Sequence, residues 1–321
     1  MGIIDPRKQR RRRITYAEYR RLRRKYLIQN ALIGCCIGNL FVFCGGFTCF
    51  AALLISFAAS PPDTTNILIL GSDARPDTNE EQIARTDSIM VLSVNGEGQV
   101  VSLFSLPRDV FIESPTFGTL RANTIVRNAE LNIPGSGIDE MIASMERTFG
   151  FQIDHYIRVS FESFVDVVDA VGGVDIDVPK NIVDNEYPTP DYGIIRIEFQ
   201  EGRQHMDGET ALIYARTRHA DSDYERAERQ QQVISAVIDK LTNPLYFYRV
   251  PAAGAAVAAN VETDMNIAEM TALTPGFVLY GRSPEQIEQF VVDRDHVLRG
   301  NNGEAIPNMS RIQPWVEAHL H

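Results

Sequence analysis

Short apolar runs rich in β-branched residues recur from residue 66 onward and predict the strands of a sheet. The first three runs are Asn66–Gly71, Ser88–Val94 and Gln99–Leu106. The segment Asn95-Gly-Glu-Gly98 joins the last two and is typical of a hairpin turn, so these two strands should pair antiparallel. The hairpin brings the start of one strand beside the end of the other.

Charged residues flank these strands, and the hairpin should gather them at one edge of the sheet. Arg85 and Asp87 precede the second strand, and Arg108 follows the third. If the first strand runs parallel to the third, Asp73 reaches the same edge. Because α/β proteins usually bind ligands at such an edge, these four residues are candidates for a binding site.

Helical and extended segments alternate after the third strand, which predicts a layered α/β domain over residues 66–321. The expected helices are Ile138–Phe149, Phe161–Ala170 and a short one that Asp207 caps and that runs to about Tyr214. The expected strands are Asp154–Val159, Val174–Val178 and Ile194–Phe199. Further on, the pattern predicts helices at Ile267–Leu273 and Pro284–Val291 and a loop at Gly300–Ser310.

Another helix should begin at about Asp223, because Ser222-Asp-Tyr-Glu225 matches a capping box. Its apolar stripe consists of Val233, Ile234, Val237, Ile238 and Leu241. At 100° per residue, Arg226 and Gln230 fall on the same stripe, and Arg229 falls on its edge. We therefore expect these polar side chains to point inward with the stripe.

Arg216, Arg218, Arg226 and Arg229 lie within fourteen residues of one another. An inward guanidinium needs an anion, because an unpaired buried charge is very costly. For a single arginine, an internal ion pair with Asp221, Asp223 or Glu228 satisfies this need. For four planar guanidinium groups, we favour a ligand with several negative charges, such as a phosphate compound.

The N-terminal region predicts a membrane anchor. Residues 1–26 form a basic tail with eleven Lys and Arg against two acidic residues, a net charge of +9. No charged residue occurs between Lys25 and Asp63, and Ala31–Ala59 is longer than the roughly 20 residues that cross a bilayer. We expect residues 27–60 to span the cytoplasmic membrane once, with the N-terminus inside, residues 61–65 as a linker and residues 66–321 outside. The alternative is a cleaved signal peptide, but its apolar core usually has only about 7–15 residues.

Cysteine usage and charge narrow the chemistry of the outer domain. All four cysteines, Cys35, Cys36, Cys44 and Cys49, lie in the expected anchor, so the outer domain has neither a disulfide nor a thiolate zinc site. The whole chain has 31 Lys and Arg residues and 42 Asp and Glu residues. Without the tail's eleven basic and two acidic residues, 20 basic and 40 acidic residues remain, a net charge of −20. Such a surface repels nucleic acid, so the arginine cluster is a local exception.

A Gly34-x-x-x-Gly38 spacing in the anchor is a weak indication of a dimer.

Six segments occur in an order that resembles the LytR–CpsA–Psr family. They are Asn66–Arg75, Arg85–Met90, Ser105–Asp109, Val168–Val174, Asp207–Arg218 and Asp221–Gln230. The resemblance covers roughly residues 66–241, and the basic tail and single anchor also match. It implies an α/β/α domain with a mixed central sheet and a hydrophobic slot for a polyprenyl chain. It also implies an enzyme that transfers a glycopolymer from a polyprenyl-pyrophosphate carrier to peptidoglycan with a divalent cation, usually Mg²⁺.

The resemblance also implies roles for the candidate residues. Asp73 and Asp87 would bind Mg²⁺ at the pyrophosphate. The residues expected to hold or act on the pyrophosphate are Arg85, Arg108, Arg216, Arg218 and Asp223, of which Asp223 would orient the arginines or interact with the acceptor. Those expected to bind substrate around them are Arg75, Arg121, Arg226, Arg229 and Gln230. Here Arg121-Ala-Asn-Thr stands where the family often has Lys-x-Asn-x-Ala, so the sequence departs from the pattern at Arg121 and Asn123.

The chemistry expected of this site is electrostatic. When a sugar hydroxyl attacks one phosphorus, negative charge spreads over the phosphoryl oxygens, and fixed guanidinium groups with a metal ion stabilise it. Two alternatives use the same residues: a polyprenyl-pyrophosphate pyrophosphatase with water as acceptor, and a non-catalytic lipid-binding or regulatory envelope protein. The carboxylate pair argues against the second alternative, because carboxylates beside an anionic ligand need a metal between them.

Overall fold

The computed structural model describes residues 54–58, 63–72, 86–189, 193–217, 223–243, 261–281 and 286–321, together with isolated residues between 246 and 259. The chain divides into two compact units, Met1–Ser56 and Phe57–His321, and all elements below belong to the second. The predicted basic tail and nearly all of the predicted anchor lie outside the described residues. Among the residues that are described, no helix is both long and apolar enough to cross a bilayer.

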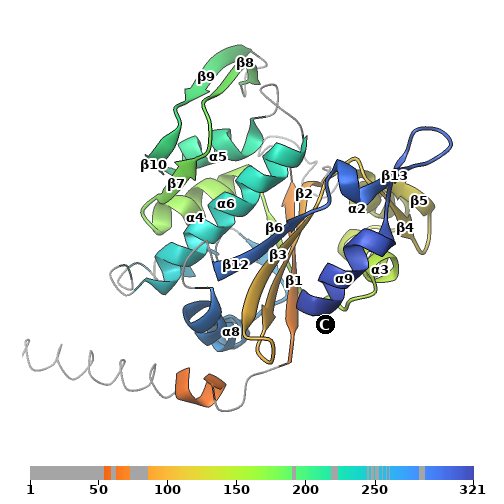
Figure 1. Ribbon diagram of the computed structural model, residues 1–321, viewed down its shortest axis with the longest axis horizontal. Coiled ribbons are helices and arrows are strands. Elements are labelled where there is room, and N and C mark those ends of the chain that lie inside the picture. Colours follow the sequence, from red (N-terminus) through yellow and green to blue (C-terminus); the bar gives the residue numbers. More distant parts are fainter. Residues whose placement is uncertain are drawn as a thin grey trace, which may run out of the picture. The chain divides into compact units, whose positions relative to one another are not determined.

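A mixed six-stranded sheet forms the centre of the domain, in the order β11-β6-β1-β2-β3-β12 (Figure 1). Its strands are β1 (Thr65–Ser72), β2 (Thr86–Asn95), β3 (Val100–Leu106), β6 (His155–Val159), β11 (Glu262–Thr263) and β12 (Ile287–Val291). β2 pairs antiparallel with both β1 and β3, so β1 runs parallel to β3 with β2 between them. The predicted hairpin and the predicted direction of the first strand are therefore confirmed.

Helices cover both faces of this sheet and give three α/β/α layers (Figure 1). Successive residues of a strand point to opposite faces: Leu68 and Leu70 pack in the core beneath α2, α3 and α9, whereas Ile67 packs in the core beneath α6 and α8. These helices are α2 (Ala122–Asn132), α3 (Gly137–Phe149), α6 (Asp223–Thr242), α8 (Ile267–Tyr280) and α9 (Met309–His319).

A third core connects α6 to a small region built from α4 (Phe161–Ala170), β7 (Val174–Val178), β10 (Gly202–Met206) and α5 (Gly208–Arg216). Ser160 and Asp207 cap α4 and α5 through their side chains. The hairpin of β8 (Ile182–Pro188) and β9 (Ile194–Phe199) belongs to the same region. α6 thus packs against the central sheet on one side and against α5 and β7 on the other.

Two predictions for the C-terminal part are wrong. Where we predicted a helix over Pro284–Val291, Ile287–Val291 is strand β12, which pairs with the open edge of β3 and buries Ile287. Pairing with the edge of β3 outweighs the helical propensity of this segment. Gly300–Ser310 is not simply a loop, because it contains β14 (Ala305–Pro307), which pairs with β13 (Val297–Arg299), and the start of α9. Elements that we did not predict are the hairpin β4 (Phe111–Ser114) and β5 (Gly118–Arg121), helices α2 and α9, and strands β8 and β10.

An ion pair ties the end of α6 to β7. Lys240 is 5% exposed, and its Nζ donates to Asp175 Oδ2 at 2.6 Å. Burial alone would raise the pKa of Asp175, but hydrogen bonds from Lys240 and His205 outweigh it and hold that pKa below its ordinary value. The ion pair therefore stabilises the fold at pH values above the ordinary carboxyl pKa. This stabilisation is lost as the pH falls through the lowered pKa of Asp175.

We predict that Asp175→Asn lowers the free energy of unfolding at pH 7 by about 2–3 kcal/mol, because it leaves a buried ammonium without its partner. The loss should shrink as the pH falls through the lowered pKa of Asp175, because the wild-type carboxyl then becomes protonated as well. Denaturant unfolding at pH 7 and at acidic pH measures it, with the exposed Asp177→Asn as control. Equal stability of the two variants at pH 7 would contradict the role given to this pair.

Candidate active site

Eight of the twelve candidate site residues lie in the described part of the chain, namely Asp87, Arg108, Arg121, Arg216, Asp223, Arg226, Arg229 and Gln230. The other four, Asp73, Arg75, Arg85 and Arg218, lie outside the described residues, and their roles stay predictions. Three of the described residues come from three elements that meet at one edge of the central sheet. Asp87 begins β2, Arg108 follows β3, and Asp223 begins α6.

Arg108 lies at the centre of this group. Its Nη1 donates to Asp87 Oδ1 at 3.0 Å, and its Nε lies 3.7 Å from both Asp223 Oδ2 and Asp109 Oδ2. Burial opposes the charge of the guanidinium, but Asp87, Asp223 and Asp109 outweigh it and raise the pKa of Arg108. Arg108 is therefore charged at every pH at which the protein is folded.

One donor of Arg108 is unsatisfied. Its Nε is buried and has no hydrogen-bond partner among the described residues, since the carboxylate oxygens of Asp109 and Asp223, each 3.7 Å away, are too distant. Thr86 Oγ1 and Asn123 Oδ1 are buried without partners as well, and the Asn123 N–H donates to the Arg108 carbonyl. Buried polar atoms nearly always have partners, so a ligand oxygen at Arg108 Nε would complete this arrangement.

Arg226 and Gln230 point inward, as their helical spacing predicts. Arg226 is 6% exposed, its Nη1 lies 3.1 Å from Asp223 Oδ1, and its Nη2 donates to the Asp87 carbonyl at 3.4 Å. Gln230 accepts from Ser88 Oγ at 2.8 Å and donates to the Ala215 carbonyl at 3.4 Å. The internal ion pair that we considered as an alternative is therefore present for Arg226, which fixes Asp223 beside Arg108.

Arg229 is bonded to the main chain at the end of α5. Its side chain is buried, its Nε donates to the Tyr214 carbonyl at 3.1 Å, and its Nη2 donates to the Thr217 carbonyl. Because Thr217 precedes Arg218, Arg229 holds the backbone that leads to a predicted site residue. These bonds favour a structural role for Arg229 over the substrate binding that we expected.

Arg216 is held by aromatic rings. Its guanidinium carbon lies 4.1 Å from the centre of the Phe161 ring and 5.6 Å from that of Tyr187, and Nη1 donates to the Tyr187 hydroxyl at 3.3 Å. Burial raises the pKa of Tyr187, although the charge of Arg216 opposes this. Within the described residues no carboxylate pairs with Arg216, so its positive charge is oriented but not neutralised. Our sequence reading did not identify Phe161 or Tyr187, because neither carries a motif of its own.

Arg121 lies at the surface. Its side chain is 57% exposed, 3.7 Å from Asp109 Oδ1, and its guanidinium carbon is 5.6 Å from the centre of the Phe111 ring. Asp109 also contacts Arg108, so Arg121 lies one residue away from the central group. This location suits the rim of a site better than its centre.

A divalent cation fits the one described carboxylate of the predicted metal pair. Asp87 is 32% exposed, and Oδ1 accepts from Arg108, which leaves the second oxygen without a hydrogen bond or ion pair among the described residues. Such an oxygen is a suitable ligand for Mg²⁺. In the part of the chain that the structure describes, no three His, Cys, Asp or Glu side chains gather around a metal position. The contribution of Asp73 stays a prediction.

Comparison with known proteins places the chain in a family. The LytR_cpsA_psr family model matches residues 53–313. The chain belongs to this family. Its relatives include the polyisoprenyl-teichoic acid–peptidoglycan teichoic acid transferase TagU of Halalkalibacterium halodurans, 31% identical over 275 residues, which are 83% of this chain and 82% of the relative. Another is the corresponding transferase TagV of Bacillus subtilis, 28% identical over 253 residues, 74% of this chain but only 61% of that relative's length.

Solved structures of the LytR_cpsA_psr family have the same fold. The crystal structure of B. subtilis TagV matches 80% of this chain and 97% of that chain, with 26% identity and a TM-score of 0.64. TagT bound to LIIa-WTA matches 79% of this chain and 89% of that chain, with 23% identity and a TM-score of 0.59, which supports the fold alone. The mixed central sheet between two helical layers is thus the fold of this family.

We predict that Arg229→Met lowers the free energy of unfolding by about 2 kcal/mol or more, because two buried carbonyl oxygens lose their donor. Arg196→Met is the control, since Arg196 is 60% exposed and pairs only with Glu198 at the surface; its effect should stay within about 0.5 kcal/mol. Denaturant unfolding measures both variants. If Arg229→Met unfolded like the wild type but lost substrate binding, Arg229 would be a ligand-binding residue after all.

Proposed function

We propose that this protein is a membrane-anchored phosphotransferase that moves a glycopolymer from a polyprenyl-pyrophosphate carrier to a hydroxyl of peptidoglycan. Family membership and the transferase names of the relatives support this reaction class. The observation that carries the proposal is Arg108, a partly buried, charged guanidinium at the edge of the sheet whose buried Nε has no hydrogen-bond partner among the described residues.

The pyrophosphate is bound by arginines in this proposal. Arg108 offers its free Nε, and Arg216 offers a charge that the Phe161 and Tyr187 rings orient without neutralising. Arg85 and Arg218 complete the set. Guanidinium groups bind phosphate oxygens through charge-assisted hydrogen bonds, and several of them suit a group with several negative charges.

The reaction needs no covalent enzyme intermediate. The oxygen of the acceptor hydroxyl forms a bond to the glycopolymer's phosphorus, and the bond from that phosphorus to the bridging oxygen breaks, which releases polyprenyl phosphate. Arg108 and Arg216 stabilise the charge that builds on the phosphoryl oxygens. Asp223, fixed by Arg226 at 3.1 Å, accepts a hydrogen bond from the acceptor hydroxyl, directs its oxygen toward the phosphorus and takes up the hydroxyl proton as the new bond forms.

Mg²⁺ or another divalent cation belongs to the proposal. Asp87 and Asp73 would hold it, and it would supply positive charge at the pyrophosphate. The cation would also remove the conflict between Asp87 and an anionic substrate, which Arg108 alone only partly relieves.

The proposed location follows from the substrate as well as from the N-terminal sequence. A polyprenyl carrier stays in the membrane, so the enzyme needs to be there too. The basic tail followed by an uncharged stretch of bilayer length supports a single-pass anchor with the catalytic domain outside the cytoplasm.

We predict that Arg108→Ala lowers the transfer rate by about 10²–10³ with little loss of thermal stability, since removing one electrostatic donor often costs this much. Arg147→Ala is the matched control, because Arg147 is 54% exposed and pairs with Glu113 away from the site. Transfer of labelled glycopolymer to peptidoglycan is assayed beside release of polyprenyl phosphate without peptidoglycan. Wild-type turnover by Arg108→Ala would refute the proposed site, and equally fast release with water alone would identify a pyrophosphatase.

We predict that transfer stops in excess chelator. We also predict that Asp87→Asn raises the Mg²⁺ concentration needed for half-maximal activity by about tenfold or more, because loss of a residue that only supports a metal ligand already weakens metal binding by about this much. Asp109→Asn is the control, since Asp109 also lies near Arg108 but is 49% exposed. Thermal unfolding checks that both variants fold. Full activity in excess chelator would eliminate the metal from the mechanism.

A further inference from the structure

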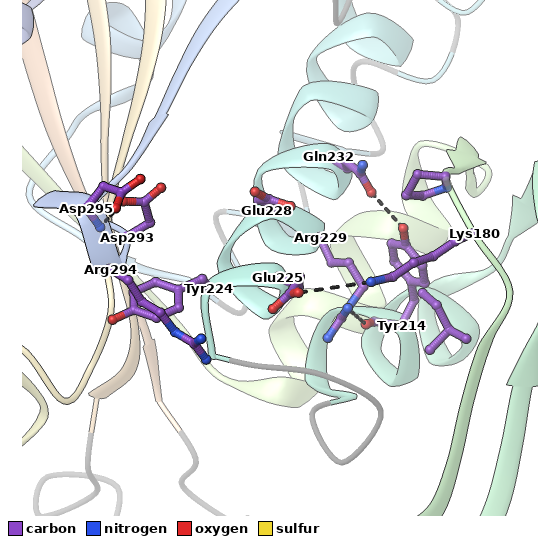
Figure 2. Close-up of a pocket in the computed structure, with 12 residues that line it drawn as sticks. Lys180, Tyr214, Tyr224, Glu225, Glu228, Arg229, Gln232, Asp293, Arg294 and Asp295 are labelled. Atoms are coloured by element: carbon purple, nitrogen blue, oxygen red, sulfur yellow. Dashed lines mark hydrogen bonds and ion pairs between the residues drawn. The ribbon is translucent and has the colours of Figure 1, made fainter.

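A pocket of about 910 Å³ lies beside the first turns of α6, on a face of the helix that does not carry Arg226. Figure 2 shows Glu225, Glu228 and Gln232 of α6 along one wall, with Asp293 and Asp295 across from them. Most of the residues that line it carry charged or polar side chains, which does not suit the hydrophobic slot that the family resemblance implies; that slot stays a prediction. None of the roles described above uses this pocket.

The lining matches the chemistry of a saccharide. Three of the carboxylates in the lining belong to Glu225, Glu228 and Asp293. Asp293 Oδ1 lies 2.6 Å from His296 Nδ1 and accepts from the Asp295 N–H, and Glu225 Oε1 lies 4.0 Å from Lys180 Nζ. A carboxylate has about four acceptor positions on its two oxygens, so the lining can also accept from sugar hydroxyls. The Tyr214 hydroxyl donates to Gln232 Oε1 at 2.6 Å, which fixes the amide and turns its NH₂ away from Tyr214 (Figure 2). The Tyr224 ring, whose centre lies 5.7 Å from the guanidinium carbon of Arg294, adds an aromatic surface that can stack on the C–H face of a sugar.

The charge of the pocket disfavours a polyanion. Its lining has four carboxylates, whereas its exposed cations are Lys180 and Arg294, because the third cation, Arg229, is buried and bonded to main-chain carbonyls. The surrounding outer region has a net charge of −20 and repels anionic polymers as well. An occupant with uncharged sugar rings therefore fits better than a phosphate-rich glycopolymer.

The pocket adjoins the arginine site. Tyr224 follows Asp223, which lies 3.7 Å from Arg108. Burial is the main cause that raises the pKa of the Tyr224 phenol, and Asp293, Asp223 and Asp109 add to it. Asp223 and Asp109 thus act on Arg108 and on Tyr224 alike, and the lining of the pocket begins on α6 one residue after Asp223.

We propose that this pocket is the acceptor site and that it binds the uncharged sugar rings of a peptidoglycan glycan strand, with the attacking hydroxyl directed to Asp223. This inference rests on the proposed transferase function. It separates the two substrates: the donor pyrophosphate lies at Arg108 and Arg216, and the acceptor saccharide lies along α6 between Tyr224 and Gln232.

The test uses the full-length protein in detergent with two pocket variants, Glu228→Gln and Tyr224→Ala, and the exposed Glu209→Gln of α5 as control. Transfer is measured against increasing concentrations of soluble, uncrosslinked glycan strands, and release of polyprenyl phosphate is measured without them. We expect each pocket variant to raise the KM for glycan about tenfold, which is the effect of losing one charged hydrogen bond or a contact of similar strength. Cleavage of the donor by water should stay within about twofold of the wild-type rate.

An unchanged KM for glycan in both variants would overturn the proposal, and so would a parallel fall in donor cleavage, which would assign the pocket to the donor. Calorimetric titration of glycan strands into the wild type and the variants gives a readout that does not depend on turnover. If the wild type transferred nothing, the proposed function would fail, while weaker glycan binding by the pocket variants would still support a saccharide site. Tighter binding of an anionic phosphate polymer than of glycan would refute it.

Discussion

The site depends on a row of alternating acidic and basic side chains, formed by Asp87, Arg108, Asp223 and Arg226. Ion pairs of 3.0 Å and 3.1 Å stand at its two ends, and the central contact between Arg108 and Asp223 is longer, at 3.7 Å. The series joins the start of β2, the segment after β3 and the first turn of α6. The charges of these partly buried groups balance one another, and at the longer central contact Arg108 Nε has no hydrogen-bond partner within the part of the chain that the structure describes.

Arginines near this row have two different tasks. Arg226 and Arg229 bind groups of the protein itself, the Asp223 carboxylate in one case and main-chain carbonyls in the other. Arg108 and Arg216 are the two that we propose bind the ligand: the first has a nitrogen without a partner among the described residues, and the second contacts aromatic rings. Position on the helix stripe does not distinguish these tasks, because Arg226 and Arg229 are both buried for structural reasons.

The sequence predicts the central part of the fold better than its margins. The Asn95–Gly98 turn and the β-branched runs beside it specify a hairpin, and this hairpin alone brings Asp87 to Arg108. Helical periodicity likewise predicts that Arg226 and Gln230 point inward. Local signals fail where tertiary pairing decides, as at Ile287–Val291, which becomes a strand because β3 offers an open edge. α2 lacks a side-chain cap, so nothing local marks its start. The rings of Phe161 and Tyr187 meet Arg216 only through the folding of α4 and the β8–β9 hairpin.

A crystal structure of the protein with a bound polyprenyl-pyrophosphate-linked sugar tests the central claim most directly. The account predicts that a phosphate oxygen lies within about 3.2 Å of Arg108 Nε, with the guanidinium of Arg216 on the same pyrophosphate group. Binding of the pyrophosphate elsewhere, with Arg108 Nε still lacking a partner, would contradict it.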